Sequence, residues 1–379
     1  MKSLGLNLLV RLQVHRPRGS RMVVKVGVIG GGRFGTNHLR TFTQLAYVGR
    51  VKLVALADID PKVLEEQRRA FGVKGYVNYE DMLRKEDVDA VTVVTPDHLH
   101  REIAITAAKA GKHILVEKPL DVTVSGCTEM IDVARRNDVI LQVDFHKRFD
   151  PDFIELKRAI GSNKLGKIEY GYAWMEDTLE VPSKWFPKWA PKSSPAWFLG
   201  IHFYDLVRWL IESMPKRAYA TGVKYKLSSM NVDAFDSIQA KVEFDNGSSF
   251  FFDTSWILPE SFPAIVNQGL RVVGSEGTWE VDSQNRGVEA CTTSEGPKTF
   301  NTHFIREGRD KLGRTMFYGY GIDSIVDFVE NVEFVQSGGK IRDLAGKYAS
   351  GEEGRIATSM AVAIHKSIAE GRIVDIEQH

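Results

Sequence analysis

The sequence predicts an α/β protein with two domains: an N-terminal doubly wound parallel sheet and a C-terminal α+β domain with a largely antiparallel open sheet. From Val24 to about Phe145, short apolar strands alternate with helical stretches. Between Ala218 and Val281, strand-like stretches follow one another without helices. Alternation is typical of a parallel sheet covered by helices, and direct succession favours antiparallel pairing. A length of 379 residues also favours more than one core.

The expected elements follow from hydrophobic periodicity and helix caps. Asp60 and Pro61 mark a helix start, and Gly111 marks a helix end. In the first half we expect strands over 24–29, 51–57, 89–94, 113–116 and 139–143, and helices over 61–71, 98–110 and 122–136. In the second half we expect helices over 151–160, 202–212, 322–335 and 354–369, a loop over 181–195, and strands over 167–176, 218–226, 237–244, 248–256, 270–273 and 278–281.

These elements suggest three segments. We expect residues 23–146 to form the doubly wound first domain and residues 147–379 to form the second domain, whose last helix is a candidate to pack back on the first. Residues 1–22 differ because they hold four arginines and no acidic residue. A disordered tail, a start codon upstream of a true start at Met22, and a transit peptide all fit that composition.

Composition excludes several classes of partner. Lys and Arg total 50 against 49 Asp and Glu, so a net charge of +1 gives no bulk attraction to nucleic acid or to a membrane surface. No apolar run approaches the roughly 18–20 residues of a spanning helix. Cys127 and Cys291 lie far apart without metal-type spacing, which favours a reducing cytoplasm over a disulfide framework.

The strongest motif is Gly30-Gly31-Gly32-Arg33-Phe34-Gly35, which follows the first strand and precedes a helix. That order predicts a dinucleotide-binding turn with the pyrophosphate at the helix N-terminus. Asp58 ends the second strand 23 residues after Gly35, and Ile59 follows it. In dinucleotide-binding folds an acidic residue at this spacing accepts hydrogen bonds from the ribose. A carboxylate there favours NAD over NADP, although Asp58 also fits a plain surface turn.

Two further segments end strands at the same edge of the sheet, where ligands bind in doubly wound folds. Thr95-Pro96-Asp97-His98-Leu99-His100 follows the fourth strand, and Glu117-Lys118-Pro119 follows the fifth. The two histidines lack a matching Cys or carboxylate cluster, so we expect no metal site. Lys118 is placed to polarise a hydroxyl or carbonyl oxygen, although a lone lysine is usually a solvated surface group.

The run A-A-K-A-G-K-H-I-L-V-E-K-P-L at residues 107–120 resembles the hallmark of the Gfo/Idh/MocA oxidoreductases, which include glucose–fructose oxidoreductase and inositol dehydrogenases. Supporting motifs occur in the family's order over residues 23–375: Gly30-x-Gly32-x-x-Gly35, Asp58, Thr95-Pro96-Asp97-x-x-His100, Arg148-Phe149-Asp150-Pro151 and Gly200-Ile201-His202-Phe203-Tyr204-Asp205-Leu206. The resemblance implies a Rossmann domain, a second domain that carries substrate residues and subunit contacts, and a homodimer or homotetramer.

The resemblance also implies the site. Lys118 and His202 are the expected catalytic residues, because an imidazole titrates near neutrality and can take a hydroxyl proton. Asp205 lies three residues after His202 and is expected to hold the ring or to bind a substrate hydroxyl. The expected substrate ligands are Lys118, His146, Lys147, Arg148, Trp185 and Asp205; the expected cofactor ligands are Gly30, Gly32, Arg33, Phe34, Gly35, Asp58, Ile59, Thr95, Pro96, His100, Glu117 and Lys118.

One position departs from the family pattern. The family often has Asp four residues before the catalytic His, and here that residue is Phe198. Either the substrate differs, another carboxylate takes over, or alcohol oxidation is weak. The cationic residues 146–148 also suit a carboxylated or phosphorylated substrate, although a solvated charge cluster fits them as well.

The favoured function is hydride transfer between NAD and a secondary alcohol of a sugar, cyclitol or sugar derivative. Of the four tryptophans between residues 174 and 197, we expect one or two in a carbohydrate-sized pocket. Two alternatives remain open: an NAD-dependent enzyme with no net redox, acting by epimerisation, elimination or glycosidic cleavage, and a non-catalytic NAD-binding protein.

Overall fold

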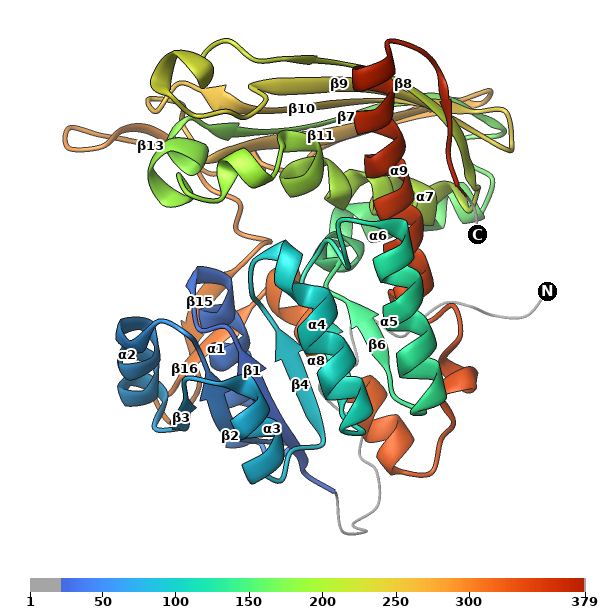
Figure 1. Ribbon diagram of the computed structural model, residues 1–379. Coiled ribbons are helices and arrows are strands. Elements are labelled where there is room, and N and C mark those ends of the chain that lie inside the picture. The colour runs from blue at the N-terminus through green and yellow to red at the C-terminus, as the bar shows by residue number, and fades with distance from the viewer. Residues whose placement is uncertain (1–21, 378–379) are drawn as a thin grey trace.

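The computed structural model describes residues 22–377, which form two large sheets with helices around and between them and two small hairpin sheets (Figure 1). The first sheet is wholly parallel and confirms the predicted doubly wound domain. Its strand order is β3 (Lys74–Tyr76), β2 (Val51–Ala57), β1 (Val24–Ile29), β4 (Ala90–Val93), β5 (His113–Val116) and β6 (Leu141–Val143). The order reverses direction between β1 and β4, which places a ligand-binding crevice at the carboxyl ends of these strands.

Five helices connect these strands. They are α1 (Arg33–Tyr47), α2 (Pro61–Phe71), α3 (Tyr79–Lys85), α4 (His100–Lys109) and α5 (Val124–Arg136). The predicted cap of α2 is present, since the Asp60 side chain accepts a hydrogen bond from the Lys62 N–H. Helix α4 begins later than predicted because residues 97–99 form a tighter helical turn.

The second sheet is mostly antiparallel, as predicted, with one parallel pair between β7 and β10. Its order is β12 (Gly277–Asp282), β11 (Val266–Gly274), β7 (Ile168–Thr178), β10 (Ser249–Leu258), β9 (Ser237–Phe244), β8 (Pro215–Val223) and β17 (Val374–Asp375). One face of this sheet packs against helices that lie toward the first sheet, including α6 (Pro151–Gly161) and α7 (Ile201–Ile211) (Figure 1).

The last two helices tie the two sheets together. Helix α8 (Tyr320–Gln336) packs its buried Ile325, Phe328 and Val329 into the core around β1 and α1. Helix α9 (Gly351–Glu370) packs on both α5 and β8 (Figure 1). The chain therefore returns to the nucleotide domain after building the second sheet.

Several small elements were not predicted. They are β3, α3, β17 and two hairpins, β13 (Glu289–Thr292) with β14 (Gly296–Thr299) and β15 (Arg306–Arg309) with β16 (Thr315–Tyr318). The prediction of a loop over 181–195 was wrong in part, because short helical turns form at Val181–Trp185 and Ala190–Lys192. The predictions for residues 1–21 lie outside the described residues. Over 22–377, no helix combines the length and apolar character needed to cross a membrane.

Candidate active site

Gly30, Gly32 and Gly35 meet the three requirements of a dinucleotide-binding turn. Gly30 has φ of 100°, and a Cβ there would lie 2.1 Å from the Val94 carbonyl oxygen. A Cβ on Gly35 would lie 2.0 Å from the Gly30 carbonyl oxygen. Helix α1 can therefore pack this close to the turn only because residue 35 has no side chain. Gly32 faces open space, with nothing within 4 Å of its would-be Cβ. The turn therefore fits NAD, because its backbone is tightly folded and leaves room for a pyrophosphate at the N-terminus of α1.

Asp58 is fixed beside this turn at the end of β2. Its Oδ2 accepts a hydrogen bond from the Gly31 N–H at 2.7 Å, and its Oδ1 accepts one from the Asp60 N–H at 2.8 Å. Ile59 is 84% exposed next to it. The carboxylate is thus held at the edge of the glycine turn, where the ribose of a bound dinucleotide lies in this type of fold.

Arg33 reaches from the glycine turn to the second domain. Its guanidinium carbon lies 3.6 Å from the centroid of the Trp185 ring, a cation–π contact. Trp185 therefore lies beside the predicted cofactor turn. The other three tryptophans of that segment pack on other side chains: Trp174 on Tyr172, Trp189 on Phe198 and Trp197 on His365.

His100 joins the two loops that follow β4 and β5. Its Nδ1 lies 2.7 Å from the Pro119 carbonyl oxygen, and its Nε2 lies 2.8 Å from the Thr95 carbonyl oxygen. The ring is buried, so these contacts fix the loop after β4 against the residue that follows Lys118. The structure gives His100 a role in holding the crevice together.

Glu117 lies in a buried group with His38 and Asp144. The His38 Nε2 lies 3.6 Å from a carboxylate oxygen of each acid. Burial raises the pKa of Asp144 to about 7, with the Glu117 charge adding to the rise. His38 and Asp144 were not predicted, because each is a single polar residue inside an otherwise ordinary helix or strand end.

Lys118 lies between the two domains. Its side chain is buried, and its Nζ donates a hydrogen bond to the Phe198 carbonyl oxygen at 2.9 Å. The same ammonium lies 4.5 Å from the centroid of the Phe198 ring. Burial lowers the pKa of Lys118, and nearby carboxylates, Glu117 foremost, oppose that shift.

His202 lies in the first turn of α7, four residues after Phe198. Its ring is buried and lies 4.8 Å from the His146 ring, centroid to centroid. Burial, with the neighbouring Lys118 charge, lowers the pKa of His202 well below its usual value, so the imidazole is neutral. Its Nδ1 has no hydrogen-bond partner among the described residues. The structure thus brings Lys118, His146 and His202 together.

Arg148 and Asp205 bind each other. Two guanidinium nitrogens of Arg148 donate to the two Asp205 oxygens, one of them at 2.8 Å, and a third donates to Glu353 of α9 at 2.8 Å. The expectation that Asp205 holds the His202 ring is therefore wrong, because both carboxylate oxygens are taken by Arg148. Whether either residue also binds substrate stays a prediction.

Lys147 points to the second sheet instead. Its buried Nζ donates to the Gln268 side-chain oxygen, and burial lowers its pKa to about 7. Asp177, at the inward face of β7, lies near both Lys147 and Lys118; burial raises its pKa to about 8, and the two lysines oppose that rise. Asp177 was not predicted, because the strand expected from the sequence ended at residue 176.

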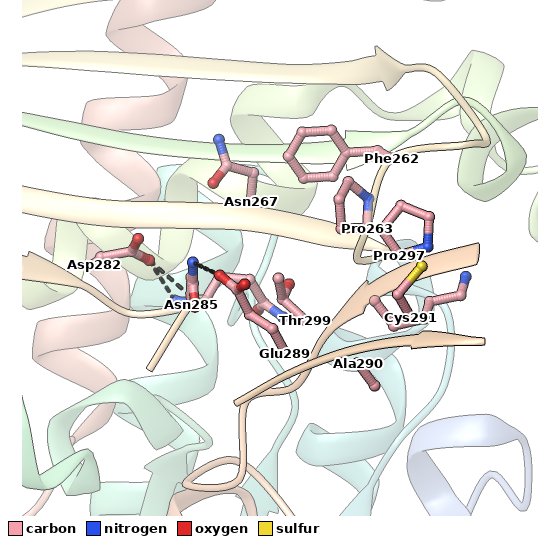
Figure 2. Close-up of a pocket in the computed structure, with 12 residues that line it drawn as sticks. Phe262, Pro263, Asn267, Asp282, Asn285, Glu289, Ala290, Cys291, Pro297 and Thr299 are labelled. Atoms are coloured by element: carbon pink, nitrogen blue, oxygen red, sulfur yellow. Dashed lines mark hydrogen bonds between the residues drawn. The ribbon is translucent and has the colours of Figure 1, made fainter. Parts of the chain in front are cut away.

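A separate pocket lies beside the hairpin of β13 and β14 (Figure 2). Asn267, Gln284 and Cys291 are among its lining residues, and it contains none of the predicted site residues. The Asn285 side chain donates to Glu289 at 3.1 Å, and the Asn285 backbone donates to Asp282 at 2.9 Å. These contacts anchor the hairpin. The candidate active site is the buried cluster of Lys118, His146 and His202, which lies outside this pocket.

Comparison with known families agrees with this geometry. The model described as the oxidoreductase family with an NAD-binding Rossmann fold matches residues 24–145. The GFO/IDH/MocA C-terminal domain matches residues 153–280. The two matches together span more than half of the chain.

Curated relatives and solved structures extend over nearly the whole chain. Myo-inositol 2-dehydrogenase of Thermotoga maritima is 26% identical over 361 residues, which cover 94% of this chain and 99% of that protein. Inositol 2-dehydrogenase of Rhizobium meliloti is 26% identical over 359 residues, covering 94% and 100%. A crystal structure of myo-inositol 2-dehydrogenase from Lactobacillus plantarum has the same fold, with a TM-score of 0.78, 24% identity, and coverage of 94% of this chain and 100% of that chain.

Proposed function

The chain belongs to the GFO/IDH/MocA family of oxidoreductases, and from this premise we propose that it oxidises one secondary alcohol of an inositol-type cyclitol to a ketone. It is an NAD-dependent enzyme that acts on CH–OH groups of sugars or cyclitols. The proposal adds the inositol ring as substrate and assigns roles to residues. The relatives named as inositol dehydrogenases support the substrate, and the crevice geometry supports the roles.

One contact carries the assignment of roles. The Lys118 Nζ is bonded to the Phe198 carbonyl oxygen, which lies one helical turn before His202. An ammonium from the nucleotide domain and an imidazole from the second domain therefore line the same crevice. A hydroxyl oxygen between them would accept a hydrogen bond from Lys118 and donate its proton toward His202.

The electrostatics suit that division of labour. His202 is neutral, so it can accept a proton, and the charge on Lys118 stabilises an oxygen that is losing its proton. When bound, NAD⁺ supplies the acceptor for the hydride that leaves the carbinol carbon. The glycine turn, Asp58 and Arg33 would hold the dinucleotide, and burial of the crevice between two domains excludes water.

The test is reduction of NAD⁺ in the presence of a cyclitol and sugar panel, followed by the absorbance of the reduced nicotinamide. We expect turnover with myo-inositol or scyllo-inositol and much slower turnover with aldoses. Bound nicotinamide that never accumulates in reduced form while the sugar is rearranged or cleaved would contradict the proposal in favour of chemistry without net redox. Absence of any conversion would favour a non-catalytic NAD-binding protein.

The proposal also covers the cellular compartment and the assembly of the enzyme. Cys127 is buried, Cys291 is exposed and both are free, which supports a reducing cytoplasm. The outer face of the second sheet carries Tyr172, Tyr219 and Phe251, each more than 40% exposed. Aromatic side chains gathered on an uncovered sheet face support a homodimer or homotetramer joined through that face.

A further inference from the structure

Arg33 belongs to the glycine turn of the first domain, but the second domain holds its side chain. The guanidinium carbon lies over the Trp185 ring, 3.6 Å from the ring centroid. A cation over an aromatic face is attracted to the ring without using its N–H donors, and a guanidinium has five of them. Within residues 22–377 the Arg33 guanidinium makes no ion pair and no hydrogen bond, so these donors are free.

The free donors lie at the turn that leaves room for a pyrophosphate. Arg33 follows Gly32, whose would-be Cβ meets no atom within 4 Å, and both residues are exposed. Guanidinium groups bind phosphate oxygens through paired N–H donors. A mobile arginine would lose side-chain entropy when it binds an anion, and an arginine already held on an indole loses less. The contact with Trp185 therefore prepares Arg33 to bind an anion.

The segment that carries Trp185 is itself anchored to the crevice. The Trp189 indole nitrogen donates a hydrogen bond to Asp97, in the loop after β4, at 2.9 Å. The Phe198 carbonyl oxygen accepts one from Lys118, in the loop after β5, at 2.9 Å. One segment of the second domain thus contacts the loops after β1, β4 and β5, and these anchors fix the place of the Trp185 ring.

We propose that Trp185 is a positioning residue for the cofactor: it holds the Arg33 guanidinium at the glycine turn, where Arg33 binds the pyrophosphate of NAD. Trp185 acts through Arg33, and NAD binding therefore depends on a side chain of the second domain. The proposal rests on the NAD-binding turn and is independent of which alcohol is oxidised. It is also separate from the substrate contact predicted for Trp185, which stays a prediction.

The test is the affinity for NADH, measured by titration of the nicotinamide fluorescence in a double-mutant cycle. Trp185→Leu removes the aromatic face and is expected to raise the Kd of NADH about fivefold. Arg33→Met removes the donors themselves and is expected to raise the Kd further. Because Trp185 acts through Arg33, adding Trp185→Leu to Arg33→Met should leave the Kd at the value of Arg33→Met alone.

Two more variants separate this role from a general effect on the segment. Trp185→Phe retains an aromatic face and should restore most of the affinity. Lys184→Met changes the adjacent residue and breaks its exposed ion pair with Glu260, and the Kd should stay at the wild-type value. In turnover, Trp185→Leu should raise the KM for NAD⁺ and leave kcat at saturating NAD⁺ unchanged, because the indole does not act on the reacting carbon.

A wild-type Kd in folded Trp185→Leu would overturn the proposal. An equal loss in the Arg33→Met background would also overturn it, because the indole would then act without the arginine. Should Trp185→Leu fail to fold, Arg33→Lys decides: it keeps the charge but loses the planar group, and a wild-type Kd in that variant would overturn the proposal. A wild-type protein that binds NADH but oxidises no polyol would refute the proposed function, while the Kd values would still decide the role of Trp185.

Discussion

In the proposed reaction, Lys118 and His202 hold one hydroxyl group from two sides. Replacement of Lys118 by Met removes the cation that stabilises the developing oxyanion, and we expect kcat to fall about 10²-fold or more. His202→Gln removes the proton acceptor, with an expected fall of similar size. Initial rates of NAD⁺ reduction at saturating cyclitol check both variants.

Lys109→Met is the matched control, because Lys109 is exposed at the end of α4. Its kcat should equal that of the wild type. A Lys118→Met variant that keeps full kcat would contradict the assigned role, whatever its effect on nucleotide binding.

Sequence reasoning could predict residues of the site only where a motif or a strand end marked them. It predicted Lys118 from its place at a strand end and from the resemblance, His202 from the resemblance, and Asp58 from its spacing from the glycines, and their roles stay predictions. It missed Asp177, because the predicted strand ended at residue 176 and the face of a charged residue at a strand end depends on pairing with β11. It did not predict the ion pair of Asp205 with Arg148, because Arg148 comes from a loop far away in the sequence.

In the turn between β1 and α1, one glycine is needed for folding and another leaves room for the cofactor. Gly32 has φ of −64°, and a Cβ there meets no atom within 4 Å, so Gly32→Ala should leave the folded state intact. The methyl group would instead occupy the space that a pyrophosphate needs. We expect the Tm to stay within about 2 °C of the wild type and the affinity for NAD to fall about tenfold or more.

Thermal unfolding and a fluorescence titration with NADH measure these two effects. Gly35→Ala is the contrasting variant, because its Cβ would lie 2.0 Å from the Gly30 carbonyl oxygen and should lower the Tm. Normal NAD affinity in folded Gly32→Ala would contradict the placement of the pyrophosphate.

The Arg148 ion pairs join α7 and α9 to the loop after β6. Asp205 is 2% exposed, and Asp205→Asn leaves the buried guanidinium with Glu353 as its one carboxylate among the described residues. Breaking one side of a buried ion pair is destabilising, and we expect the free energy of unfolding to fall by about 3 kcal/mol. Urea denaturation provides the measurement.

An Asp205→Asn protein of wild-type stability with a strongly raised KM would instead support the original expectation that Asp205 binds a substrate hydroxyl. A loss of stability with an unchanged KM would instead give Asp205 a structural role, in which its ion pair with Arg148 holds the helix that carries His202.

At the scale of the whole molecule, the sequence predicts the long strands of both large sheets but not the short strands and hairpins beside them. Long strands and helices have clear periodicity, and these were predicted within a few residues. The hairpin β13–β14 has four exposed residues in its first strand and therefore no alternation to detect. The docking of α8 onto β1 joins residues about 300 positions apart, and no local pattern encodes such a contact.

The uncovered face of the second sheet leads to a prediction about assembly. Phe251 is 45% exposed in the central region of that face. Phe251→Lys would remove an exposed aromatic side chain and add a second ammonium beside Lys241 on this face, so we expect the assembly to dissociate toward monomers. Light scattering coupled to size exclusion measures the mass. Lys216→Glu, a charge change on the same sheet at the start of β8, is the control. A wild-type monomer would contradict the proposed assembly.

The convergence of an ammonium and an imidazole on one hydroxyl oxygen is the central claim, and a crystal structure with NAD and myo-inositol bound tests it most directly. We predict one cyclitol oxygen within about 3.2 Å of both the Lys118 Nζ and a ring nitrogen of His202. A bound cyclitol whose reacting hydroxyl touches neither nitrogen would contradict the account.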